Sequence, residues 1–166
     1  MDYAVIRPLI KSGDLLAFSH ESWGSLYDLK VQLVRMATRS EYAHVAIAWV
    51  IGDRVFALEA VRPEIRNFPL SKLGDFYHLP LDIEWTNAVE EHALSHIGEP
   101  YSQLLAISAF FQKIKAEGCW ECALYAQDIL KKAGRNLDVR STPTELVKEA
   151  QRQGASCRFI SNKEGI

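Results

Sequence analysis

The spacing of hydrophobic positions along the chain changes near residue 85. Before that point, short runs rich in Val, Ile, Ala and aromatic residues are typical of β-strands. These runs predict strands at residues 15–18, 43–50, 54–61, 64–68 and 78–83. One further short strand is expected near the end of the chain, at residues 155–160. After residue 85 the apolar residues recur every three or four positions, which is the period of an amphipathic helix.

Helical spacing predicts five helices. They are expected at residues 24–38, 85–97, 103–115, 119–133 and 146–152. Gly134 lies where a helix C-terminus favours glycine, and Thr142-Pro143-Thr144-Glu145 has the form of a capping box that opens the last helix. Because most strands precede most helices, the pattern favours an α+β fold over a parallel α/β fold.

Composition limits the class of protein. The chain has 166 residues, of which 48% are hydrophobic and 24% charged, with a net charge of −2. This length fits a single domain spanning residues 1–166. Both signs of charge are interspersed, so no basic field for nucleic acid is expected.

Targeting signals are not evident at the start of the sequence. Residues 1–8 lack the basic and apolar segments of a secretory signal, and the longest apolar run, residues 104–111, is too short to span a bilayer. We therefore expect no integral membrane segment and a protein that is cytoplasmic as synthesised. Export, or delivery by a phage, stays open, and the sequence sets no oligomeric state.

The number of cysteines is small and odd, which argues against a disulfide framework. They are Cys119, Cys122 and Cys157. The Cys119-x-x-Cys122 spacing has redox and zinc interpretations, but no second ligand pair of similar spacing accompanies it. For Cys157, core packing is the favoured interpretation.

A β-hairpin places a histidine beside an acid. If Gly52-Asp53 forms a two-residue turn, Glu59 lies opposite Ala46, and His44 and Glu59 become diagonal neighbours on one face. That face is expected to be a shallow platform lined by alanines, and the opposite face to be the core. A His oriented by a carboxylate is the base of a nucleophilic dyad or triad, although a half-exposed His near a solvent-facing Glu is the alternative.

Cys119 is the candidate nucleophile. It follows Gly118 at the expected start of a helix, where amide N–H groups and the helix dipole favour a thiolate and a developing oxyanion. Cys122 lies one turn later on the same apolar stripe, where a thiol behaves as a small hydrophobe. Core packing is the competing explanation for both thiols.

Six segments, in one order along the chain, resemble the NlpC-type papain-like cysteine peptidases, in particular the circularly permuted YiiX-like branch, in which the His precedes the Cys. The segments are Ser12-Gly13-Asp14-Leu15-Leu16, Tyr42-Ala43-His44-Val45-Ala46-Ile47, Leu58-Glu59-Ala60, Gly98-Glu99-Pro100-Tyr101, Cys119-Trp120-Glu121-Cys122-Ala123 and Thr142-Pro143-Thr144-Glu145-Leu146. The resemblance implies a permuted papain-like fold, a mostly antiparallel sheet packed against helices. It also implies Cys119 as nucleophile, His44 as base and Glu59 as the residue that orients the base.

The same resemblance leaves other residues with weaker roles. Tyr101 and Trp120 are expected near the oxyanion or substrate, with core packing the alternative for Tyr101. An alternative alignment makes Cys122 the nucleophile. We prefer Cys119, because Glu121 then occupies the family's Glu position, where it is interpreted as a structural first-turn acid. Trp120 departs from the Ser that the family often has after its nucleophile.

His92 and His96 form a competing pair, four residues apart on one helical face, which is the spacing that zinc enzymes use. No Glu follows the first His and no third ligand is evident, so solvated histidines are favoured and no metal or cofactor is expected.

The resulting prediction is a cysteine peptidase or amidase that needs no cofactor. The resemblance implies a peptide or isopeptide bond of bacterial peptidoglycan as substrate. Lecithin–retinol acyltransferase, a related permuted fold, acts on lipid acyl groups, so an acyl-lipid substrate is the first alternative. A non-enzymatic binding or structural module on the same fold is the second.

Overall fold

The structure is a computed structural model that describes residues 1–19, 41–101, 121–139 and 142–162. Within these ranges the strands are β1 (Leu15–Phe18), β2 (His44–Ile51), β3 (Arg54–Ala60), β4 (Ile65–Pro69), β5 (Phe76–Leu79) and β6 (Arg158–Ile160). The α-helices are α1 (Tyr3–Ile6), α3 (Asn87–Ser95), α5 (Cys122–Lys132) and α6 (Pro143–Arg152), with 3₁₀ turns η1 (Arg7–Leu9) and η3 (Leu70–Lys72). The predicted helices at residues 24–38 and 103–115 lie outside the described residues.

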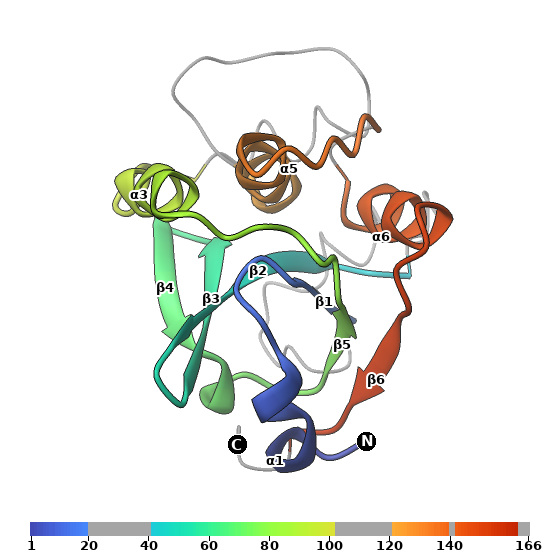
Figure 1. The fold of residues 1–166 in the computed structure, drawn as a ribbon. Helices are drawn as coiled ribbons and strands as arrows, with labels where there is room; N and C mark the ends of the chain where they lie inside the picture. Colours follow the sequence, from blue (N-terminus) through green and yellow to red (C-terminus); the bar gives the residue numbers. More distant parts are fainter. Residues whose placement is uncertain (20–40, 102–120, 140–141, 163–166) are drawn as a thin grey trace.

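All six strands join one sheet in the order β4-β3-β2-β1-β5-β6, and every neighbouring pair is antiparallel. Helices α3, α5 and α6 lie along one side of this sheet, whereas α1 and the N-terminus lie at the opposite side (Figure 1). The predicted α+β class with a mostly antiparallel sheet is therefore confirmed.

The first core fills the space between the sheet and α5. Val45, Ile47 and Leu58 from the central strands pack there with Ala126 and Ile129 of the helix, and all five side chains are buried. This is the face of the hairpin that the sequence predicts to be core.

The second core covers the opposite face of the sheet, which corrects the expectation of a shallow platform. Ala46 and Ala57 lie there beneath Tyr3, Ile6 and Phe76, all of them buried. The short helix α1 supplies part of this cover, and four residues are too few to give a helical period in the sequence. Small alanines on this face accommodate the larger side chains packed over them.

Element boundaries differ from the sequence prediction in two informative places. Strand β5 ends at Leu79, before the predicted residues 80–83, because Pro80 has no N–H to donate to a ladder. Helix α5 begins at Cys122, not at Cys119: Glu121 has an extended backbone (φ −126°, ψ 163°) and is the N-cap. The predicted cap of α6 is confirmed, since the Thr142 hydroxyl accepts from the Glu145 N–H at 3.3 Å.

Candidate active site

The β2–β3 hairpin brings the predicted base and acid together. Ile51 pairs with Arg54 across a two-residue turn, and this register continues to Ile47 opposite Leu58. His44 Nε2 donates to Glu59 Oε2 at 2.8 Å. The predicted register and the predicted proximity of His44 and Glu59 are both present.

Arg66 is a third member of this group that the sequence analysis missed. It lies directly opposite Glu59 across the β3–β4 ladder. Its Nε and Nη2 atoms donate to Glu59 Oε1 at 2.9 and 2.8 Å. Pairing the strands predicted at residues 54–61 and 64–68 in the correct register would have placed Arg66 opposite Glu59. The sequence of the turn between them does not determine that register.

Glu59 is held as a carboxylate although it is fully buried (0% exposed). Burial by itself opposes ionisation, but the hydrogen bonds and positive charge of His44 and Arg66 hold the pKa of Glu59 below its usual range. Charged Arg66 and carboxylate Glu59 together fix the ring of His44 in one orientation. Because Nε2 faces Glu59, a further group that exchanged a proton with this ring would do so at Nδ1.

His44 lies on the sheet face opposite α5. Its ring contacts Phe18 at 5.7 Å between centroids, and Phe18 belongs to the second core. Val45, the next residue, points toward α5, as the alternation of a strand requires. A group that reacts with His44 must therefore approach the end of β2 from that face.

Cys122 lies on the other face. Its thiol packs in the first core and is 7% exposed, and the backbone of Val45 donates a hydrogen bond to its sulfur. Burial and then the charge of Glu121 raise the pKa of this thiol, so the thiolate that nucleophilic attack needs is disfavoured. The observed site supports the interpretation of Cys122 as a small buried hydrophobe.

Glu121 has a different role from the one the sequence predicts. As N-cap of α5, its carboxylate accepts from the amides of Ala123 and Leu124 at 3.2 and 2.7 Å. These two amides are therefore occupied by Glu121, while the amides near Cys119 that the sequence analysis proposed for an oxyanion lie outside the described residues. Burial raises the pKa of Glu121 to about 7, against the lowering effect of the two amides.

Cys119 and Trp120, together with the apolar run at residues 104–111, lie outside the described residues. Tyr101 is described. Its backbone N–H donates to Pro63 O at 2.9 Å, and its half-buried ring packs against the first core. Cys157 is also half-buried, with its sulfur 3.7 Å from the Tyr42 hydroxyl, and burial raises its pKa. Both placements agree with packing.

The Ser12-Gly13-Asp14 segment has a structural explanation. Asp14 is buried and accepts from the Leu81 N–H and from His78 Nε2, at 3.2 and 2.7 Å, which fastens the start of β1 to the end of β5. Gly13 has φ +92°, and a Cβ at this position would lie 2.3 Å from the Ile83 side chain. Only glycine fits both the backbone angle and the close contact.

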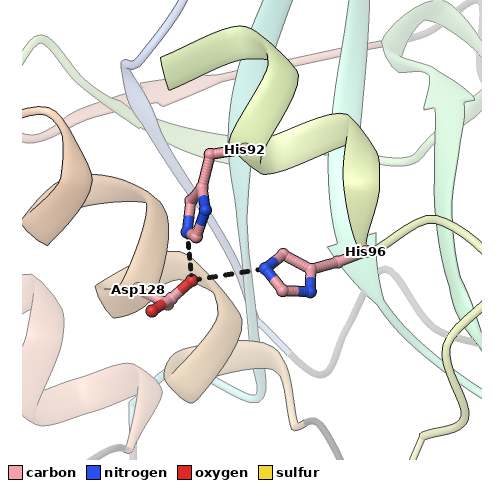
Figure 2. Close-up of side chains that lie close together, drawn as sticks. All are labelled: His92, His96 and Asp128. Carbon is pink, nitrogen blue, oxygen red and sulfur yellow. Dashed lines mark hydrogen bonds and ion pairs between the residues drawn. The ribbon is translucent and has the colours of Figure 1, made fainter. Parts of the chain in front are cut away.

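A second polar group joins α3 to α5. His92 Nε2 and His96 Nε2 lie 2.6 and 3.6 Å from Asp128 Oδ2, as Figure 2 shows. The expectation that the two histidines have no third ligand partner is therefore wrong. Asp128 is 36 residues away from His92 in the sequence and reaches it through helix packing, which local spacing does not reveal.

The described residues contain no helix that is long and apolar enough to cross a membrane.

Comparisons with known proteins identify a fold. No family model and no curated protein matches the chain. Among solved structures, the crystal structure of yiiX from Escherichia coli O157:H7, described as a metalloprotein and as DUF1105, is similar with a TM-score of 0.54. The match covers 93% of this chain and 90% of that chain at 16% sequence identity. The predicted YiiX-like fold is thus supported over nearly the whole chain, while this level of identity concerns the fold alone.

Proposed function

We propose that the protein is a cysteine hydrolase of the peptidase or amidase type, with His44 as general base. The observation that carries the proposal is the His44–Glu59–Arg66 chain, in which the buried His44 has its Nε2 held at 2.8 Å by the buried, ionised carboxylate of Glu59. This is the orienting half of a catalytic triad. The YiiX-like fold is consistent with this class of enzyme.

Cys119 is the proposed nucleophile. Of the three cysteines, Cys122 and Cys157 have thiols whose pKa values are raised, which opposes thiolate formation at neutral pH. Cys122 also faces the core on the side of β2 opposite His44. Cys119 precedes the N-cap of α5 by two residues. It also follows His44 in the chain, which is the order of base and nucleophile in the YiiX-like branch that the sequence resembles.

The chemistry is acyl transfer. The Cys119 thiol gives its proton to His44 Nδ1 and its sulfur bonds to the substrate carbonyl carbon. When the tetrahedral intermediate collapses, the carbon–nitrogen bond breaks and His44 protonates the leaving amine. Water then attacks the thioester, His44 takes one of its protons, and the thiol is regenerated with release of a carboxylic acid. We propose a peptide or isopeptide bond, as in bacterial cell-wall peptide, as the substrate class.

Alkylation of the full-length protein with iodoacetamide, followed by mass-spectrometric mapping, tests the nucleophile. We expect Cys119 to react at least about tenfold faster than Cys157, because each unit of pKa depression gives about ten times more thiolate at neutral pH. His44→Ala should remove this difference. Cys157→Ala is the matched control and should leave the rate at Cys119 unchanged.

Two outcomes contradict the proposal. Fast labelling that maps to Cys122 would overturn the assignment of Cys119. Labelling of Cys119 no faster than Cys157, and insensitive to His44→Ala in a folded variant, would overturn the cysteine hydrolase and favour a binding module on the same fold.

A further inference from the structure

We propose that His92, His96 and Asp128 form a binding site for a divalent transition-metal ion of the zinc class, built from other residues than the His44–Glu59–Arg66 group. Each residue offers one ligand atom, and the three atoms lie within 4.8 Å of one another. Both histidines come from α3 and its C-cap, and the aspartate comes from α5, so the ion would join the two helices (Figure 2).

The separations between ligand atoms fit a metal of this size. Zinc lies about 2.0–2.2 Å from imidazole nitrogen and carboxylate oxygen, so tetrahedral ligands are roughly 3.3 Å from one another. His96 Nε2 is already 3.6 Å from Asp128 Oδ2. His92 Nε2 lies 2.6 Å from the same oxygen, where a proton holds the two atoms together. An ion would take the place of that proton with side-chain movements of about 1 Å.

An outer carboxylate selects the tautomer of His96 that metal binding needs. His96 Nδ1 donates to Glu99 Oε1 at 3.1 Å, which leaves Nε2 as the nitrogen whose lone pair faces Asp128. A ligating histidine commonly has such a partner, because the carboxylate both orients the ring and raises its basicity. The arrangement is thus more than two surface histidines near an acid.

Tyr125 holds the two helices in place beside this cluster. Its hydroxyl donates to Ala93 O at 2.8 Å, and its ring meets that of His96 edge-on at 6.1 Å. Tyr125 and Ala93 are both buried. The ligands from α3 and α5 are therefore already positioned, so little ordering of the backbone is required when the ion binds.

The chemistry of the donors indicates the class of ion. Two imidazole nitrogens with one carboxylate oxygen suit Zn²⁺, Co²⁺ or Ni²⁺ better than Ca²⁺ or Mg²⁺, which prefer all-oxygen sites. The side chains of His92, His96 and Asp128 are 29%, 16% and 33% exposed, so the ion can enter from solvent. Three protein ligands leave a fourth position for water.

The site lies along α5, away from the start of the helix. Asp128 lies six residues after Cys122 on α5, which is roughly 9 Å along the helix axis. The ion would cross-link α3 to α5 and stabilise the folded state in proportion to its occupancy. It has no part in the acyl transfer proposed for His44.

Zn²⁺ titration of the chelator-treated full-length protein, followed by calorimetry and thermal unfolding, tests the site. We expect a single equivalent to bind and to raise Tm. His92→Ala and Asp128→Asn should abolish both effects, while Glu99→Gln should weaken binding by about 10- to 100-fold. Asp53→Asn, at the exposed hairpin turn, is the matched carboxylate control and should bind as the wild type does.

Co²⁺ substitution adds a readout that distinguishes the ligands. Nitrogen and oxygen ligands give the weak visible bands of tetrahedral Co²⁺, whereas cysteine ligands give an intense thiolate charge-transfer band. A charge-transfer band, no rise in Tm, or unchanged affinity in folded His92→Ala and Asp128→Asn variants would each overturn the proposal. The cluster would then be an ion-pair contact between helices.

Discussion

Glu59 and Glu121 are two carboxylates with nearly equal burial, at 0% and 3% exposure, and their pKa values move in opposite directions. Glu59 faces Arg66 and His44, and its pKa is lowered. Glu121 faces two backbone amides and the Cys122 thiol, and its pKa is raised to about 7. The difference teaches that a cation, more than the number of hydrogen bonds, decides whether a carboxylate in this core stays ionised.

The contrast also separates the roles of the two acids. A carboxylate that stays charged can hold His44 in one tautomer and stabilise an imidazolium that forms during a reaction. A carboxylate with a pKa near 7 is half protonated at neutral pH and makes a cap of variable strength for α5. Of the two acids, Glu59 is suited to orient a base, and Glu121 is suited to a structural position.

The largest expected effect comes from Glu59→Gln. The amide cannot neutralise Arg66 or accept from both Arg66 and His44 as the carboxylate does, so we expect a loss of about 3 kcal/mol in the free energy of unfolding at pH 7. Urea unfolding measures it. Glu121→Gln is the matched comparison, and an equal loss in both variants would contradict the distinction between the two acids.

Glu121→Gln should stabilise the protein by an amount that grows as pH rises, the opposite sign from Glu59→Gln. The folded-state pKa of Glu121 is raised from 4.5 to about 7, so its contribution to stability is fully present below pH 4.5 and is lost as pH rises through 7. Gln keeps an oxygen for the two amides and has no charge to bury. We expect the variant to gain about 2 kcal/mol over the wild type between pH 5 and pH 8.

Unfolding of both proteins at these two pH values checks this expectation. Glu145→Gln, at an exposed acid in the first turn of α6, is the control for the substitution itself. A gap between wild type and Glu121→Gln that stays constant with pH would show that Glu121 is ionised throughout.

Arg66→Met should make Glu59 resemble Glu121. The lowered pKa of Glu59 contributes stability above pH 4.5 that is lost as pH falls through the folded-state value. Loss of the Arg66 cation should raise that pKa, so acid unfolding should begin at a higher pH. The cost at pH 7 should be about 1–2 kcal/mol, because Arg66 is 40% exposed and its charge is partly screened. An unchanged acid transition would show that His44 by itself keeps Glu59 ionised.

Cys122→Ala is the smallest change. It removes one buried sulfur beside Glu121 and should cost about 1 kcal/mol. Iodoacetamide labelling at Cys119 should keep its wild-type rate, since Cys122 packs on the core side of β2. Loss of the fast label in this variant, with Cys119 intact, would make Cys122 the nucleophile.

The sequence predicted best where geometry depends on neighbouring residues. The two-residue turn determined the pairing of Ile51 with Arg54, and this pairing placed Glu59 near His44. The predicted start of α5 at Cys119 was wrong, because hydrophobic spacing does not distinguish an N-cap Glu from a Glu in the first turn. Glu is also not among the residues favoured at the N-cap. Arg66 was missed because its position depends on the register of β4.

Asp128 and the second core were missed for a similar physical reason. Asp128 meets His92 because α3 and α5 pack side by side, and no local period encodes which helices become neighbours. The face under α1 was expected to be shallow because its strand residues are small. The side chains that bury this face include Tyr3 and Ile6, which lie near the N-terminus and far from the hairpin in the sequence.

The hairpin turn has a consequence for how this protein can vary. His44 and Glu59 are 15 residues apart, an odd separation, and antiparallel pairing across an even-length turn places such residues on the same face. Inserting a single residue at Gly52 or Asp53 would rotate Glu59 to the α5 side and separate it from His44. Insertions of two residues would preserve the face. Among natural variants that keep this histidine and acid, turn lengths should therefore change in steps of two.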